Sequence, residues 1–251
     1  MIQTNILTSS PNKNIVAQLG RYSVIEHEKD ISPNPGSEMA AYFASQMNVR
    51  RRQVVCDLQG QGVIVQAGAM QLMIGNLEAA ADVKGVGDFF KKVASSAVTK
   101  ESAIKPKYVG SGQLILEPTT KHILLEDLAN WNGSMVIDDG LFLACDDTVN
   151  INTVMRSTLS SAALGGEGLF NTCLNGQGLV VLESPVPREE LVVIDLNQDV
   201  AKIDGNMAIA WSNTLTFTVE RTTKTLIGSA ASGEGLVNVY RGTGRILVAL
   251  T

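Results

Sequence analysis

Histidine, on which much metal and proton chemistry depends, is scarce in this chain. Of 251 residues, His27 and His122 are the two histidines, and they form no His-x-His pair. A histidine metal centre in a β protein usually gathers two or three imidazoles and a carboxylate in one cavity. No nucleophile elbow or Ser-His-Asp set is recognisable either. We therefore expect a protein that is not an enzyme and that has no cofactor, no metal site and no catalytic residues.

Basic residues are also few. The 20 Lys and Arg residues are outnumbered by 25 Asp and Glu residues, which gives a formal net charge of −5. Binding to a polyanion depends on a basic surface that releases counterions, so a general nucleic-acid binder is not predicted. The dense basic run Arg50-Arg51-Arg52 is more typical of a solvated turn or a strand edge.

Long apolar runs are missing as well. Runs such as residues 178–182 are far too short to cross a bilayer, and no N-terminal segment resembles a signal or transit peptide. The three cysteines, Cys56, Cys145 and Cys173, are odd in number and irregularly spaced. This pattern argues against a disulfide framework and suits a reducing compartment. We expect a cytoplasmic protein without a transmembrane segment.

A repeat of about 66 residues organises the chain. Segments that begin with Gly-x-Gly and continue into an aliphatic run start at Gly110, Gly176 and Gly242, and consecutive starts are 66 residues apart. The same offset aligns "IDDGLFLACDDTVNI" from Ile137 with "IDGNMAIAWSNTLTF" from Ile203. Several landmarks agree on one period, which indicates internal duplication.

A less regular first copy precedes these segments. It contains "GQGVIVQ" from Gly60, and "GSEMAAYFASQMNV" from Gly36 is interpreted as a diverged partner of the "DDGLFLACDDTVNI" segment. A unit of this size cannot bury its own apolar face, so the copies must pack on one another. We predict an all-β fold over residues 1–251: a single compact domain, built as a pseudo-threefold β-sandwich or double-stranded β-helix-like assembly with one or two short helices. The expected copies are residues 16–108, 109–174 and 175–241, followed by a closing strand over residues 242–251.

Aliphatic runs locate the expected strands. Residues 114–116, 180–182 and 246–248 are predicted to be short buried strands, each preceded by glycines that supply the positive φ of a tight turn or bulge. Alternating polarity in residues 148–154 and 214–220 predicts strands with one solvated face. Apolar spacing predicts a short helix over residues 87–98 and a helical turn over residues 157–163.

Two patterns that sometimes carry chemistry have simpler structural interpretations here. The Gly-x-Gly turns lead into strands and lack the third glycine, the lysine and the following helix of a phosphate-binding loop. The acidic pairs Asp138-Asp139 and Asp146-Asp147 would point to opposite faces of a strand, and Ile-Asp recurs at 203–204 as a turn would require.

The repeat also bears on the cysteines. Cys145 aligns with Trp211, and Cys173 aligns with Val239, which predicts two core thiols rather than nucleophiles. Cys56 aligns with polar residues, and its role stays open.

One amphipathic segment is the first candidate for an interaction surface. Phe89 and Phe90, flanked by Lys91 and Lys92, lie on the expected helix over residues 87–98. Packing of this helix on the β core is the simpler interpretation. Contact with a membrane surface or a partner protein is the functional one.

The segments "GEGLF" at residues 166–170 and "SGEGLV" at residues 232–237, placed ahead of Gly-x-Gly strands, resemble the altered-inheritance-of-mitochondria family. The resemblance runs from about residue 36 to the end. It implies a fold similar to that of the tryptophan-RNA-binding attenuation protein, and it implies no catalytic residues. Eukaryotic members are linked to mitochondrial inner-membrane organisation. The missing transit peptide points to a bacterial relative.

Three functional hypotheses follow. The first is a non-enzymatic β scaffold that presents surfaces to a protein or membrane partner, as a monomer or a small homo-oligomer. The second is nucleic-acid binding, suggested by analogy of fold. The third, a cupin-like metal enzyme, is disfavoured by the two histidines. The second hypothesis requires the fold to bring five residues into one patch: Arg50, Arg51, Arg52, Lys105 and Lys107.

Overall fold

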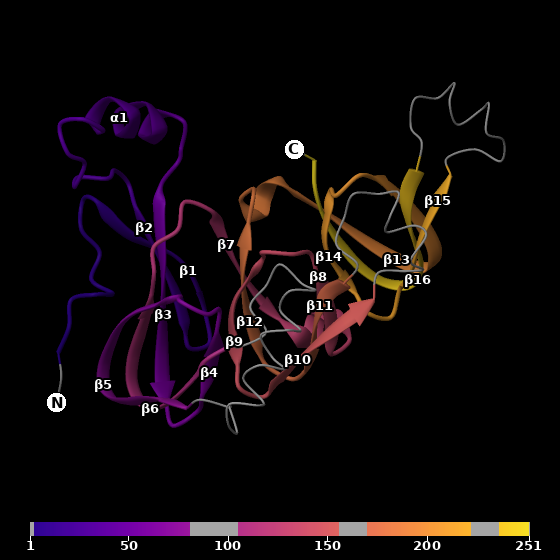
Figure 1. Cartoon of the computed structure of the whole chain (residues 1–251), viewed down its shortest axis with the longest axis horizontal. Helices are drawn as coiled ribbons and strands as arrows, with labels where there is room; N and C mark the ends of the chain where they lie inside the picture. Colours follow the sequence, from indigo (N-terminus) through magenta and orange to yellow (C-terminus); the bar gives the residue numbers. More distant parts are fainter. Residues whose placement is uncertain (1–2, 81–104, 156–169, 222–235, 251) are drawn as a thin grey trace, which may run out of the picture.

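The structure, a computed structural model, describes residues 3–80, 105–155, 170–221 and 236–250. Its regular structure is nearly all β, as predicted (Figure 1). Within these ranges, one α-helix, α1 (Glu38–Gln46), and two short 3-10 helices, η1 (Leu128–Trp131) and η2 (Arg188–Glu190), accompany the strands. The strands are β1 (Lys13–Leu19), β2 (Tyr22–His27), β3 (Arg51–Gln59), β4 (Val63–Val65), β5 (Met70–Ala80), β6 (Lys107–Leu116), β7 (His122–Asp127), β8 (Ser134–Ile137), β9 (Phe142–Asp146), β10 (Val149–Met155), β11 (Phe170–Gly176), β12 (Leu179–Ser184), β13 (Leu191–Asp204), β14 (Ala208–Ser212), β15 (Thr216–Arg221) and β16 (Leu236–Ala249).

Two sheets contain these strands. The first has the order β1-β2-β3-β6-β4-β9-β12-β7, and β5 pairs with β6 beside this path. Because β7 lies next to β1, the first sheet nearly closes into a barrel. The second has the order β10-β11-β8-β14-β16-β13, with β15 paired to β16, and it curls into a half-barrel. Figure 1 shows β1 to β6 at one end of the molecule and β13 to β16 at the other.

The hydrophobic core has three main parts. Tyr22, Leu58 and Leu114 are among the buried side chains of the nearly closed sheet. Trp131 and Met135 belong to a second cluster, which joins strands of both sheets and fills the middle of the molecule. The third cluster lies on the half-barrel. Its aromatic members pack closely, with ring centroids 5.2–5.8 Å apart: Trp211, Phe217 and Tyr240.

The aliphatic runs form buried strand segments, which confirms their prediction. Residues 114–116 lie in β6, residues 180–182 in β12 and residues 246–248 in β16, and all nine side chains are buried. Burial of such side chains contributes roughly 1.5–3 kcal/mol each. These runs therefore supply much of the apolar surface that is buried in the core of both sheets.

The carboxylate of Asp146 joins three segments across the nearly closed sheet. Its Oδ1 accepts a hydrogen bond from the Tyr22 hydroxyl at 3.0 Å and lies 3.1 Å from Nε of Arg21. Its Oδ2 accepts a hydrogen bond from the backbone N–H of Leu179 at 2.9 Å. Tyr22 belongs to β2 and Leu179 to β12, so one side chain at the end of β9 ties both to the centre of the sheet.

The Gly-x-Gly segments differ in part from the prediction. Gly110, Gly176 and Gly242 all have positive φ, at +117°, +116° and +123°. Gly176 ends β11 just before β12, as a strand-opening turn would, but Gly110 lies inside β6 and Gly242 inside β16. Of the two expected uses of the glycines, a tight turn or a bulge, the turn is wrong at these two positions. Residues on both sides stay paired to neighbouring strands, and the glycine bends a continuous strand.

The structure also corrects the interpretation of the segment from Gly36. It was interpreted as a partner of the "DDGLFLACDDTVNI" segment, which forms β9 and the start of β10, but residues 38–46 form α1. The sequence of α1, EMAAYFASQ, holds several strong helix formers and no β-branched residue, and Glu38 lies in its first turn, where the helix dipole favours a negative charge. Local propensity therefore prevails over the weak repeat match. The helices expected over residues 87–98 and 157–163 lie outside the described residues.

We predict that Gly110→Ala destabilises the protein much more than Gly60→Ala. Both glycines have positive φ, which costs an alanine about 1–2 kcal/mol. A Cβ on Gly110 would also lie 2.1 Å from the backbone oxygen of Asn76, whereas a Cβ on Gly60 would meet nothing within 4 Å. We expect Gly110→Ala to cost at least about 2 kcal/mol more in denaturant-induced unfolding. Equal losses would show that the bend in β6 does not depend on the missing side chain.

Candidate functional site

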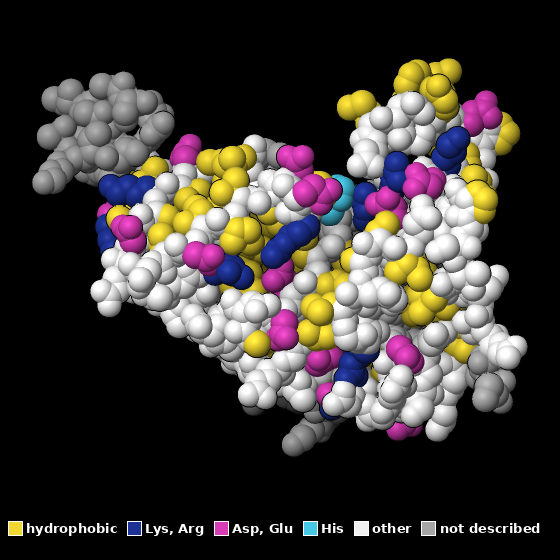
Figure 2. Space-filling view, turned by 180° about the vertical axis from the view of Figure 1, so that it is seen from behind, with side chains coloured by type: hydrophobic (Ala, Val, Ile, Leu, Met, Phe, Trp, Pro, Cys, Tyr) yellow, Lys and Arg dark blue, Asp and Glu magenta, His cyan; other side chains and the backbone are white. Residues whose placement is uncertain are grey.

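An exposed apolar helix face is the first of two candidate sites. Met39, Tyr42, Phe43 and Met47, here called the α1 surface, have exposed fractions between 61% and 78%. They recur at helical spacing, and no residue of α1 is buried. Tyr42 and Phe43 also contact each other edge to face, with centroids 5.5 Å apart. Figure 2 shows hydrophobic side chains gathered at the projecting tip of the molecule, above a band of mixed charges.

The charges next to α1 come from the run Arg50-Arg51-Arg52, and they are neutralised locally. Arg52 donates from Nε to Oε2 of Glu26 at 2.7 Å and from Nη1 to the backbone oxygen of Thr120 at 3.2 Å. Arg50 pairs with Glu26, at 3.0 Å, and with Glu28. Arg51 lies 3.5 Å from Asp30.

The structure corrects the prediction of a solvated edge for this run. β3 lies between β2 and β6 in its sheet, and Arg52, at 3% exposed, is buried within it. Burial of a guanidinium is tolerated because a carboxylate on the neighbouring strand compensates its charge.

The two lysines of the expected basic patch lie elsewhere. β3 and β6 are antiparallel, with Gln59 opposite Ser111, so Lys107 at the start of β6 is remote from Arg51 at the start of β3. Lys107 pairs with Asp147 at 2.8 Å. Lys105 donates to Oε1 of Gln66 at 2.9 Å, and its Nζ lies 4.4 Å from the centroid of the Phe142 ring. The fold therefore does not bring the five basic residues into one patch.

The other candidate interaction residues, Phe89, Phe90, Lys91 and Lys92, lie outside the described residues. In the described ranges, the α1 surface is a large exposed apolar group that the sequence did not single out. Its helical spacing was present in the sequence. It was hidden by the weak alignment of the same segment with a strand.

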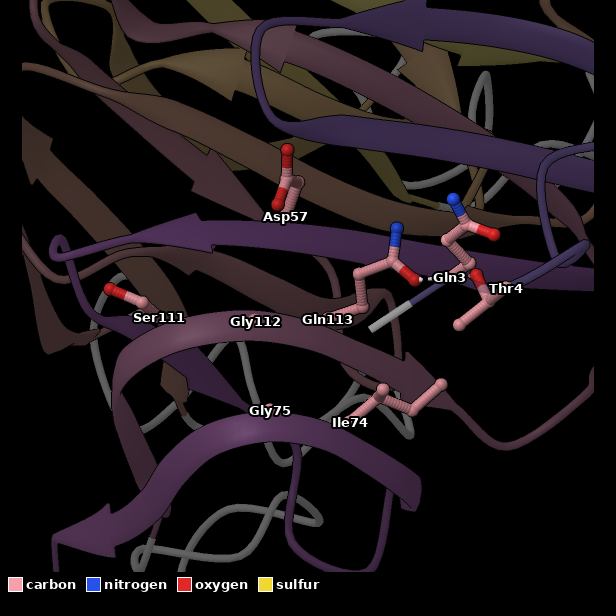
Figure 3. A pocket seen from close by; sticks show the side chains of 8 residues that line it. All are labelled: Gln3, Thr4, Asp57, Ile74, Gly75, Ser111, Gly112 and Gln113. Atoms are coloured by element: carbon pink, nitrogen blue, oxygen red, sulfur yellow. Dashed lines mark hydrogen bonds between the residues drawn. The ribbon is translucent and has the colours of Figure 1, made fainter. Parts of the chain in front are cut away.

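The second candidate site is a pocket of about 720 Å³ on the outer face of β3, β6 and β5, here called the outer pocket. Cross-strand pairing aligns its side chains: Asp57 of β3 lies opposite Gln113 of β6, which lies opposite Ile74 of β5. Figure 3 shows Gln113 next to Gln3 and Thr4 of the N-terminal segment. The Thr4 hydroxyl donates to Oε1 of Gln113 at 3.0 Å. Ser111, Gly75 and Gly112 complete the lining.

The N-terminal segment is held beside this pocket by apolar contacts. Ile6 and Leu7 pack on a small buried cluster of Ile25, Val55 and Ile115 on the outer face of the sheet. The Lys13 ammonium donates to the backbone oxygen of Asn5 at 2.7 Å. Thr4 and Gln3 thereby form a wall of the outer pocket.

All three cysteines are buried and free, which confirms the prediction for Cys145 and Cys173. Cys56, whose role was open, lies in the core of the nearly closed sheet. Burial raises the pKa of the Cys56 and Cys145 thiols well above the usual range, which keeps both protonated. The Cys56 side chain therefore acts as a small apolar core residue.

The histidines lie on β2 and β7. Burial lowers the pKa of His27 and of His122, and the neighbouring Arg51 and Arg52 lower it further. Within the described part of the chain, no three His, Cys, Asp or Glu side chains group as metal ligands would. None of the helices in the described ranges is long and apolar enough to span a membrane.

The fold and its surfaces define a class: a nearly all-β protein with bent strands, a buried set of thiols and candidate sites on its outer faces. The chain belongs to the mitochondrial biogenesis AIM24 family, whose sequence model matches residues 46–249. This confirms the family resemblance. The match includes Asp57, Gly75 and Gln113 of the outer pocket, whereas nearly all of α1 precedes it.

Two proteins of Streptococcus pyogenes are similar to this chain. An uncharacterised protein of a serotype M6 strain is 28% identical over 203 residues, which cover 78% of this chain and 79% of that protein. A second protein, known from an X-ray crystal structure, has a TM-score of 0.58 at 25% identity, over 82% of this chain and 90% of its own. Neither description names an activity or a ligand.

We predict that none of the three thiols reacts with a thiol reagent in the folded protein. At about pH 8 an exposed cysteine is partly thiolate and reacts readily, whereas burial blocks access and disfavours the thiolate. Labelling with a chromogenic disulfide should give no product under native conditions and three equivalents in denaturant. Rapid stoichiometric labelling of Cys56 in the native protein would contradict its assignment as a core residue.

Proposed function

We propose that this protein is a non-enzymatic β scaffold that docks a partner protein on the α1 surface. The observation that carries the proposal is a nine-residue helix with no buried residue, on which three large apolar side chains are exposed, together with exposed Met47 at its C-cap. A helix this short is marginal in water unless packing stabilises it. A partner that covers Tyr42 and Phe43 supplies that packing.

The charges favour a protein over a membrane surface as the partner. Helices that lie on membranes usually carry Lys and Arg on their polar face. α1 carries one charged residue, Glu38. The nearby Arg50, Arg51 and Arg52 are paired with carboxylates, so little free positive charge is left to attract anionic lipid. The same pairing disfavours the nucleic-acid alternative, which needs unpaired basic groups.

The threefold repeat is part of the proposed scaffold. Three observations support it: the matching φ of Gly110, Gly176 and Gly242, their equal spacing, and three antiparallel pairs of consecutive strands. The pairs are β5 with β6, β10 with β11, and β15 with β16. A likeness to the attenuation protein remains an expectation from the family resemblance.

We predict that Tyr42→Ser/Phe43→Ser abolishes partner capture without unfolding the protein. Each aromatic that becomes buried in a complex contributes about 2 kcal/mol, so the double variant should bind at least tenfold more weakly. The measurement is quantitative affinity capture from native cells after cross-linking. Far-ultraviolet circular dichroism and the thermal midpoint should match the wild type, since neither side chain is buried.

A matched control is Ala40→Ser/Gln46→Ser, which adds two serines to the same helix and keeps the four large apolar residues of the α1 surface. It should capture the same partner as the wild type. An unchanged set of captured proteins with Tyr42→Ser/Phe43→Ser would refute docking on α1. Flotation of the wild type with lipid vesicles, lost in the same variant, would refute the choice of a protein partner.

A further inference from the structure

We propose that the outer pocket binds an alkylammonium or guanidinium group, with the Asp57 carboxylate as its counter-ion. The pocket lies on the outer face of β3, β6 and β5, in residues separate from the α1 surface, so the inference does not depend on the proposed function. Its volume of about 720 Å³ is in the range of small-molecule sites.

Among the described lining residues, Asp57 supplies the charged group. Asp57 is half-buried and accepts a hydrogen bond from Nε2 of Gln59 at 3.0 Å. In the described ranges, no Lys or Arg nitrogen pairs with it. By contrast, Asp146, Asp147 and Glu183 each have a cationic partner at 2.7–3.1 Å. Asp57 thus leaves a negative charge uncompensated in a partly desolvated hollow, where attraction to a cation is stronger than in bulk water.

The other polar groups of the pocket add hydrogen-bond acceptors. Oε1 of Gln113 accepts a hydrogen bond from the Thr4 hydroxyl. The Gln3 amide and the Ser111 hydroxyl belong to the same lining (Figure 3). Ammonium groups offer three N–H donors, and guanidinium groups offer five and no acceptor. One carboxylate surrounded by neutral acceptors therefore suits such a donor-rich cation.

The floor of the pocket leaves room for the ligand. Gly75 and Gly112 lie opposite each other on β5 and β6 and present no side chain. The fold itself requires these glycines, since a Cβ on Gly112 would lie 2.1 Å from the backbone oxygen of Ile74. An alkyl chain attached to the cation can rest on this bare backbone beside the Ile74 side chain.

The lining also excludes other ligand classes. Among the described residues, the lining contains no Lys, Arg or His side chain to hold a phosphate or carboxylate ligand. The described part of the lining also contains no aromatic ring on which a sugar or a base would stack. A polyamine and a basic side chain of a peptide both supply the required cation, and the experiment separates these two sources.

The test measures binding to the full chain by calorimetry and by NMR, with two probes. One is spermidine, and the other is a blocked Gly-Arg-Gly peptide, whose neutral twin carries citrulline in place of arginine. We expect at least one cationic probe to bind, and Asp57→Asn to weaken it tenfold or more, as expected for loss of a charge-assisted hydrogen bond. Binding of spermidine alone identifies a polyamine site, and binding of the peptide alone identifies a peptide site.

A matched control variant is Asp195→Asn, which removes an exposed carboxylate that is paired with Arg245 on the other sheet. It should bind the probe as the wild type does. Gln113→Ala should weaken binding to a smaller extent, which gives a second, independent readout of the pocket. The proposal is overturned by equal affinity of Asp57→Asn and wild type, by equal binding of the citrulline twin, or by no binding of either probe up to about 10 mM.

Discussion

The nearly closed sheet depends on the hydrogen bonds and the ion pair made by one carboxylate, that of Asp146. Asp146 accepts hydrogen bonds from the Tyr22 hydroxyl and from the backbone N–H of Leu179, and it pairs with Arg21. A half-buried carboxylate is stable there because three donors compensate it. With the β1–β2 hairpin held in this way, β1 lies against β7, and the outer face of β3 and β6 becomes a surface on which Ile6 and Leu7 pack. Both candidate sites belong to the same end of the molecule.

Much of the fold could be predicted from the sequence. Aliphatic runs such as residues 114–116 have one stable environment, a buried strand, and the first glycine of the Gly-x-Gly ahead of each run has positive φ. Whether such a glycine opens a strand or bends one was not predictable, because the two cases differ only in which distant strands pair on either side. The helix α1 was missed because a weak repeat match outweighed clear helix propensity.

The candidate sites were harder to predict, because they depend on which distant strands pair. The burial of Arg52 follows from Glu26 on a neighbouring strand, and the outer pocket exists because register places Asp57 opposite Gln113, 56 residues away in the chain. The pattern of a single sequence does not reveal the register between strands that are distant in the chain. The burial of Cys145 and Cys173 was predictable, since the repeat supplied an apolar counterpart for each. Cys56 lacked such a counterpart, and only its position in the folded core decides its role.

The bend at Gly110 has a consequence for how this family diverges. A side chain there would collide with a carbonyl oxygen of the adjacent strand, and no rotamer relieves a clash that begins at Cβ. Surface positions have no comparable restriction. We therefore expect a relative that keeps this bend to keep a glycine at the position of Gly110, whereas its surface positions are free to differ.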